Sequence, residues 1–214
     1  MPETESENRN EKDTARVEAF SDGVFAIAIT LLILEIKVPS ETDLLKQGLG
    51  HYLWLQWPKY AAYVFTFLLL GIYWSNHHYV FRLYKKTDHL FLLLNVLFLM
   101  TISFMPYPTG ILGNYITDPA RRTTAVSFYD LGMLLPALTW QFIWYYASLR
   151  KRLIDPRLTD LFIRYLNRLY CISPLIYLIA LIVSFFNAYI SLAISVGLTL
   201  TYLFPPRKPE YRLP

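Results

Sequence analysis

The chain is poor in cysteine and in charged side chains. Cys171 is the only cysteine among 214 residues, which excludes a disulfide framework and a four-cysteine zinc site. Charged residues make up 17% of the chain, against about 25% in soluble domains, whereas 55% of the residues are hydrophobic. This excess of apolar surface needs lipid, or a very large interface, to cover it.

Several sequence signatures are absent as well. There is no Thr-Val-Gly-Tyr-Gly segment, which excludes that kind of carbonyl ion filter. No apolar segment carries an arginine at every third position, which excludes a voltage sensor of the usual kind, and no glycine-rich phosphate loop is present. The net charge is +4, but the basic residues are divided among short loops between apolar segments, so we expect no nucleic-acid partner.

Six apolar segments are each about long enough to cross a bilayer, whose hydrocarbon core needs about 20 helical residues. The sequence therefore predicts an all-α membrane protein with six transmembrane helices. These cover, approximately, residues 17–38, 53–82, 88–112, 124–149, 166–186 and 188–204. Around a six-span domain of residues 16–206, we expect a disordered cytoplasmic tail at residues 1–15 and a second cytoplasmic tail at residues 207–214.

The basic residues are distributed unequally between the two sides of this layout. Fifteen of the 20 lysines and arginines fall at the termini and around the loops after the second and fourth spans. The positive-inside rule then places both termini in the cytoplasm, and we expect a multi-pass protein of the cell membrane. On the outer side, residues 41–55 have leucines at helical spacing beside polar residues, which predicts an amphipathic helix on the membrane surface.

The first span contains a carboxylate, Asp22, roughly 7 or 8 Å from its start at about 1.5 Å per residue. A carboxylate at that depth is costly unless it has a partner, and it is a candidate functional residue. Two interpretations are open: Asp22 lines an ion path, or it holds helices together as a clasp. A rotation of about 100° per residue places Asp22 about 140° away from Ile27. We therefore favour a hydrogen-bonded clasp of Asp22 with Arg16, Ser21 and His77.

An apolar stripe runs along another face of the same span. By the same rotation, five residues fall within about 60° of Ile27. They are Phe20, Gly23, Thr30, Leu31 and Leu34. Such a stripe usually packs against another helix, so this pattern alone does not indicate a pore.

The stretch Arg16–Gly23 matches the signature R-x-x-x-F-S-D-G of the transmembrane protein 175 family of potassium channels. Trp74-Ser-Asn-His77-His78, late in the second span, resembles the tryptophan and histidine element of that family. The six-span layout extends the resemblance across nearly the whole chain. With one six-span repeat, the chain resembles the prokaryotic type, which assembles four subunits around the pore.

The resemblance implies a pore that is surrounded by the first helices and has no re-entrant filter loop. In the family's pattern, hydrophobic side chains form the narrowest point five positions after the signature aspartate, which is Ile27 here. Thr30, Leu31 and Leu34 would form the next layers. The signature residues and one histidine would form a structural and assembly motif: Arg16, Phe20, Ser21, Asp22, Gly23 and His77.

We therefore expect a potassium-selective or potassium-preferring cation channel that forms a homotetramer in the lipid bilayer, with no enzyme activity, cofactor or metal site. Two alternatives are a secondary transporter and a membrane-bound metal or haem enzyme that uses His77 and His78. Adjacent histidines point about 100° apart on a helix, so they do not easily share one metal ion. Secondary transporters often contain internal repeats, and we find no repeat in this chain.

Overall fold

The structure, a computed structural model, describes residues 2–204 and 207–212, with the backbone alone for residues 2–13 and residue 47. The described residues fold into helices joined by loops, and extended backbone pairs in them only at two isolated bridges, Tyr84–Ile154 and Leu158–Tyr211. The predicted all-α fold class is confirmed. In chain order the helices are α1 (Pro2–Leu31), the 3₁₀ turn η1 (Leu32–Glu35), α2 (Glu41–Gln47), α3 (Leu49–Leu55), α4 (Trp57–Phe81), α5 (His89–Phe104), α6 (Pro106–Tyr115), α7 (Arg122–Ser148), the 3₁₀ turn η2 (Leu149–Lys151), α8 (Asp160–Ser184) and α9 (Ala188–Thr201).

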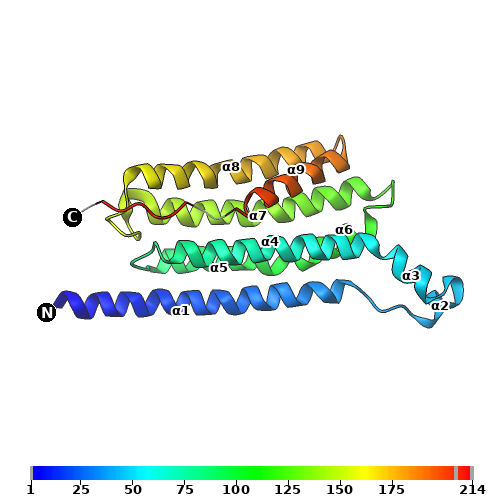
Figure 1. Ribbon diagram of the computed structural model, residues 1–214, viewed down its shortest axis with the longest axis horizontal. Coiled ribbons are helices and arrows are strands. Elements are labelled where there is room, and N and C mark those ends of the chain that lie inside the picture. The colour runs from blue at the N-terminus through cyan, green and yellow to red at the C-terminus, as the bar shows by residue number, and fades with distance from the viewer. Residues whose placement is uncertain (1, 205–206, 213–214) are drawn as a thin grey trace.

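The long helices lie roughly parallel or antiparallel in three layers (Figure 1). Helix α1 forms one flank and packs on α4 and α5, which lie in the middle with α6. Helix α7 packs on α5 and α6 and carries α8 and α9 on its other side. Helix α7 is thus surrounded by other helices, whereas α1 has protein on one side only.

Helix α1 begins earlier than the sequence predicts. Its backbone is helical from Pro2, through the residues for which we expected a disordered tail. The reason is local: glutamate, arginine and lysine are good helix formers, and a helix that is already anchored in the bundle elongates without a new nucleation step. The stretch Thr14–Glu35 is the part that is apolar enough to cross a membrane.

Three helical stretches of the described chain are long and apolar enough to cross a bilayer by themselves: Thr14–Glu35, His89–Tyr115 and Asp160–Ser184. Helices α4 and α7 have 25 and 27 residues, but tyrosine and tryptophan side chains reduce the hydropathy of both, and two histidines reduce that of α4 further. Helix α9 is apolar but has only 14 residues. The segment between the first two spans forms two short helices, α2 and α3, where we expected one amphipathic helix.

Close contacts between backbones hold the middle layer together. Pro106 lacks an amide hydrogen, so α5 ends at Phe104 and the chain continues as α6 with Pro106 in its first turn. A Cβ atom at Gly113 of α6 would lie 2.9 Å from the Cα atom of Lys59 of α4. A glycine at this position therefore sets how closely α4 and α6 approach each other.

Buried polar groups in the bundle are hydrogen-bonded across helices, as an apolar environment requires. Thr66 of α4 lies 2.9 Å from the Thr109 hydroxyl and 2.8 Å from the Tyr129 hydroxyl. Asp130 of α7 is fully buried and accepts hydrogen bonds from Ser191 and, at 2.8 Å, from Ser195, both on α9. These contacts bind the short helix α9 to the centre of the bundle.

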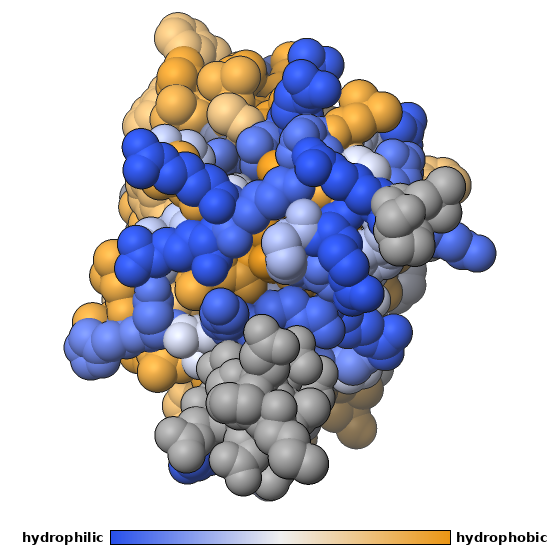
Figure 2. All heavy atoms as spheres, turned by 90° about the vertical axis from the view of Figure 1, so that its left-hand side faces the viewer, coloured by the Kyte–Doolittle hydropathy of each residue, from blue (hydrophilic) through white to orange (hydrophobic). Residues whose placement is uncertain are grey.

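One end of the bundle is strongly hydrophilic. Figure 2 looks onto this end, where both termini lie and where the loops after α4 and α7 meet. The two loops share backbone hydrogen bonds, from Lys85 to Leu153 and from Asp155 to Leu83, each 2.8 Å long. The side chain of Asp155 is almost fully buried there and binds the guanidinium group of Arg157 at 2.8 Å. The structure therefore gathers the basic loops on one side, as the span order predicts.

Candidate functional site

Helix α1 has two distinct faces. Ser21, Phe25, Ala28 and Leu32 are all buried at 1% exposure or less, and their spacing of four, three and four residues follows one side of a helix. This side packs against α4 and α5. The orientation of the other side is therefore fixed: it points away from the rest of the subunit.

The predicted apolar stripe lies on this outer side. Ile27 is 61% exposed and Leu34 66%, and Phe20, Gly23, Thr30 and Leu31 are exposed as well. The 3₁₀ turn η1 brings Leu34 into line with Leu31, because side chains three residues apart eclipse each other in a 3₁₀ helix. Six residues of the stripe thus form one continuous surface that the single chain leaves uncovered.

Thr30 is the hydroxyl-bearing residue of that stripe. Its Oγ1 donates back to its own helix, to the carbonyl oxygens of Ala26 at 2.8 Å and Ile27 at 3.0 Å. The hydroxyl hydrogen is therefore directed inward, and the oxygen lone pairs remain available on the exposed side. In chemical terms, the group can accept a hydrogen bond from water or contact a cation.

A buried chain of polar groups joins α1 to its neighbours. The Asn95 amide of α5 donates to Ser21 Oγ at 3.0 Å, and its oxygen lies 3.3 Å from His77 Nε2 of α4. The His77 ring is 1% exposed and stacks on Phe81, with ring centroids 4.1 Å apart and planes at 22°. Ser21 and His77, which we expected in one cluster, are thus linked through a third residue.

Asp22 belongs to a second set of contacts, nearer the surface. It accepts a hydrogen bond from Trp74 Nε1 of α4 at 2.9 Å. One turn earlier on α1, Glu18 contacts His78 Nδ1 at 2.5 Å, and His78 Nε2 lies 2.6 Å from Arg82. Because α1 and α4 run antiparallel (Figure 1), steps of four residues in opposite directions bring both pairs together.

The predicted single clasp is therefore divided in two. Asp22 makes its hydrogen bond to Trp74, and Ser21 and His77 bind Asn95 instead. Within the described part of the chain, no hydrogen bond or ion pair joins Arg16 to these groups. Arg16 is exposed and lines a hollow of about 490 Å³ between α1 and α5 with Phe20 and Asn95. The difference arises because helix pairing, and not depth alone, decides which polar groups meet.

The two histidines do not form a metal site with each other. His77 is buried among aromatic rings, while His78 is on the surface with Glu18 and Arg82. Among the described residues, no group of three or more histidine, cysteine, aspartate or glutamate side chains could hold a metal ion. The contacts of both histidines are those of side chains that pack helices together.

Comparison with known proteins identifies the family. The sequence model of the family described as "Endosomal/lysosomal potassium channel TMEM175" matches residues 16–106, beginning at the signature arginine. A potassium channel of Streptomyces collinus is 41% identical over 192 residues, which cover 90% of this chain and 92% of that protein. The chain belongs to the TMEM175 family.

Other TMEM175 relatives agree in sequence and in fold. A potassium channel of Chamaesiphon minutus is 37% identical over 192 residues, covering 90% of this chain and 94% of that protein. The crystal structure of a lysosomal potassium-selective channel TMEM175 homologue from the same organism superposes with a TM-score of 0.81 at 35% identity, covering 90% of this chain and 97% of that one. The helix arrangement of Figure 1 is thus that of a TMEM175 channel fold.

Two polar residues of this TMEM175 chain escaped sequence reasoning. Asn95 is the one polar residue between His89 and Met100, so an isolated amide in an apolar span was a signal that could have been used. Asp130 gave the same kind of signal in α7, because it is a carboxylate within a long apolar helix. Neither pattern reveals the partner, which depends on how the helices pack.

Proposed function

We propose that this chain is the subunit of a potassium-selective or potassium-preferring cation channel whose pore is lined by α1. The observation that carries the proposal is the uncovered stripe on α1, centred on Ile27, opposite a face that is buried in the subunit. The family and the names of the relatives, which are potassium channels, support it. A secondary transporter and a metal enzyme have no comparable observation in their favour.

We infer that four copies assemble around one axis. One helix cannot enclose a pore, and closed cyclic symmetry is the usual solution for identical subunits. Four copies of α1 would then meet along Phe20, Ile27 and Leu34, and each would remain anchored to its own α4 and α5. This arrangement would cover the apolar surface that the single chain exposes.

We also infer six spans per chain with both termini in the cytoplasm. Helix α7 is surrounded by other helices, so it does not need a uniformly apolar surface to cross the bilayer. The same holds in part for α4, which lies between α1 and α6. The basic loops at the end shown in Figure 2 are those that the positive-inside rule assigns to the cytoplasm, which suits a cell-membrane protein.

The narrowest point would be a ring of four Ile27 side chains. Such a ring offers no ligand to a hydrated cation, and water leaves a sufficiently narrow apolar neck. The neck closes by losing its water and opens when the helices tilt or the side chains rotate. Thr30, one turn further along, presents the first hydroxyl oxygens on this path.

A bilayer recording of the purified protein between potassium and sodium chloride solutions tests this function. We expect a current whose reversal potential lies towards the potassium equilibrium potential. Native mass measurement of the same sample should give four chains. A flux that saturates and is coupled to a second ion would contradict the channel and favour a transporter, and a complex of two chains would contradict the fourfold pore.

A further inference from the structure

The C-terminal tail, residues 207–212, is bound along the start of α8. Its backbone is fixed by hydrogen bonds from Thr159 to the Glu210 carbonyl, at 2.9 Å, and from Arg212 to the Arg157 carbonyl, at 2.8 Å. The Tyr79 hydroxyl donates to the Arg207 carbonyl at 2.6 Å. The tail is therefore packed against the helices in a defined position.

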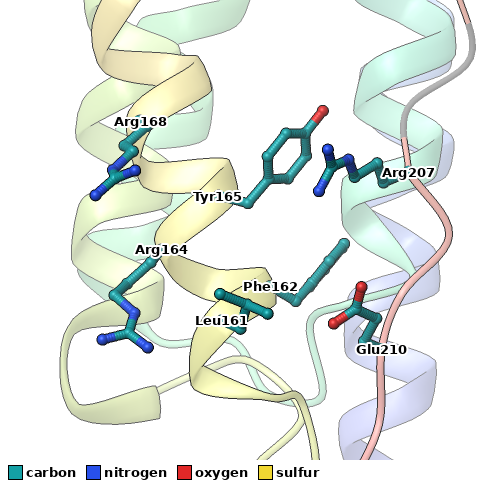
Figure 3. A pocket seen from close by; sticks show the side chains of 7 residues that line it. All are labelled: Leu161, Phe162, Arg164, Tyr165, Arg168, Arg207 and Glu210. Atoms are coloured by element: carbon teal, nitrogen blue, oxygen red, sulfur yellow. The ribbon is translucent and has the colours of Figure 1, made fainter.

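A cavity of about 420 Å³ lies between this tail and α8. Figure 3 shows Arg164 and Arg168 of α8 on one side and Arg207 and Glu210 of the tail on the other. Leu161, Phe162 and Tyr165 lie between the two sides and complete the lining. Arginines from two separate segments thus line the cavity, with Arg164 and Arg168 extending from the side of α8 that faces away from the tail.

In the part of the chain that the structure describes, acidic side chains do not neutralise the arginines of this cavity. Among the described residues, none of Arg164, Arg168 and Arg207 forms an ion pair, and Arg207 instead stacks over the Tyr165 ring at 4.5 Å. The single acid, Glu210, accepts a weak hydrogen bond from Thr159 at 3.4 Å. Three positive charges and one negative charge leave an excess that an anion would compensate.

The surroundings indicate what kind of anion fits. On α8, residues at spacings of three and four continue the face of Arg164 and Arg168 into the span. Ile172, Leu175 and Ile179 lie on this continuation and are 48%, 56% and 45% exposed. A ligand with a phosphate at the arginines and a hydrocarbon chain along these residues would match the whole strip, because guanidinium groups bind phosphate through paired hydrogen bonds.

We propose that this cavity binds the phosphate headgroup of an anionic phospholipid, with its acyl chain along the exposed face of α8. The lipid would join α8 to the C-terminal tail on the side of the membrane where both termini lie. The proposal requires a chain that spans the membrane, but it does not depend on potassium conduction.

Lipid retention by the purified, assembled protein tests the proposal. After delipidation in a neutral detergent, the protein is offered equal amounts of phosphatidylglycerol and phosphatidylcholine with the same acyl chains, and bound lipids are counted by native mass spectrometry. We expect phosphatidylglycerol to be retained at least several-fold better by the parent, and nearly equal retention of both lipids by Arg164→Gln/Arg168→Gln. Lys86→Gln/Arg150→Gln, which removes two exposed charges outside the cavity, should behave as the parent.

A further variant, a check of assembly and two soluble anions complete the experiment. Arg207→Gln removes the third charge from the other side of the cavity and should also reduce the preference, while size-exclusion profiles verify that each variant assembles. Equal phosphatidylglycerol retention by the parent and by assembled Arg164→Gln/Arg168→Gln would overturn the proposal. Glycerol phosphate or inorganic phosphate that binds in detergent as tightly as the lipid would also overturn it, because the source would then be a soluble anion.

Discussion

Trp74 of α4 donates its indole hydrogen to the carboxylate of Asp22 on α1 at 2.9 Å, and this bond crosses between two segments 52 residues apart in sequence. One turn away, His78 and Glu18 repeat the pairing between the same helices. The two sequence elements that single out this family, Arg16–Gly23 and Trp74–His78, therefore face each other. We propose that these contacts between α1 and α4 hold the first helix at a fixed rotation.

Asp22→Ala should lower the yield of assembled protein more than Asp22→Asn does. Alanine removes the acceptor and leaves the Trp74 indole without its partner, whereas asparagine retains a carbonyl oxygen that can accept the same bond. We expect a difference on the order of 1 kcal/mol, discounted because the pair is partly exposed. Size-exclusion profiles and thermal midpoints of both variants measure it. Normal assembly of Asp22→Ala with altered ion selectivity alone would place the carboxylate on the ion path instead.

Ile27→Ala and Ile27→Asn should raise conductance several-fold and weaken the discrimination between potassium and sodium. A smaller or polar ring keeps the neck wet, so it no longer closes by losing water. Thr30→Ala should reduce selectivity with less effect on closure. Single-channel currents and reversal potentials are the readouts, and Ile190→Ala, which changes an exposed isoleucine on α9, is the matched control. Unchanged currents in Ile27→Asn would show that the neck is elsewhere.

Asn95→Ala should destabilise the subunit by about 1–3 kcal/mol. The buried Asn95 amide is hydrogen-bonded to Ser21 and to His77, so its removal leaves polar groups of two other helices unsatisfied. Ser103→Ala on the same helix is a suitable control, because Ser103 is exposed and its hydroxyl donates to the Met100 carbonyl of its own helix. Thermal midpoints in detergent compare the two, and equal midpoints would argue against a structural role of the Asn95 bridge.

Gly113→Ala should destabilise the protein, by about 1–3 kcal/mol if the helices cannot separate. The added methyl group would lie 2.9 Å from the Cα atom of Lys59, so α4 and α6 would have to move apart. Gly197→Ala in α9 meets nothing within 4 Å, and should be neutral or stabilising by up to about 1 kcal/mol because alanine favours a helix. Denaturation should show a lower free energy of unfolding for Gly113→Ala and an unchanged or higher one for Gly197→Ala.

Acid should weaken the junction of the two loops at the basic end of the bundle. Hydrogen bonds from the Arg157 side chain hold the pKa of the Asp155 carboxyl below its ordinary value. A carboxyl with a lowered pKa in the folded state contributes stability above its unfolded pKa, about 3.9, and loses that contribution as the pH falls through the lower folded value. Thermal midpoints between neutral pH and pH 3 should fall more steeply in the parent than in Asp155→Asn. Parallel curves would mean that this pair does not contribute.

The faces of α1 could be predicted from the sequence because the geometry of a helix is fixed. A rotation of about 100° per residue places Ile27 and Asp22 on different sides, whatever surrounds them. The partners of Ser21 and Asp22 could not be predicted in the same way. They depend on the contacts of α1 with α4 and α5, and a one-turn shift between these helices would have exchanged Trp74 for His78.

For a related reason, the contacts of the C-terminal tail could not be predicted from the sequence. Residues 207–212 look like a short polar end of the chain, and nothing in them indicates that Glu210 lies against Thr159. Asp130 shows the same limit inside the bundle, since its serine partners lie more than 60 residues away. Local pattern identifies which groups need partners, and the packing of the helices decides where they find them.

The shortness of α9 has a mechanical consequence. At 1.5 Å per residue, its 14 residues extend about 21 Å, roughly 9 Å less than a bilayer core of about 30 Å. Its bonds to Asp130 keep it from sliding along the bundle to reach both surfaces. In the six-span arrangement that we propose, the lipid beside α9 would have to thin, at a fraction of a kcal/mol per Å of mismatch. Bilayer thickness would thereby act on the α8–α9 pair, and membranes of long-chain lipids would strain this part of the subunit more than thin membranes do.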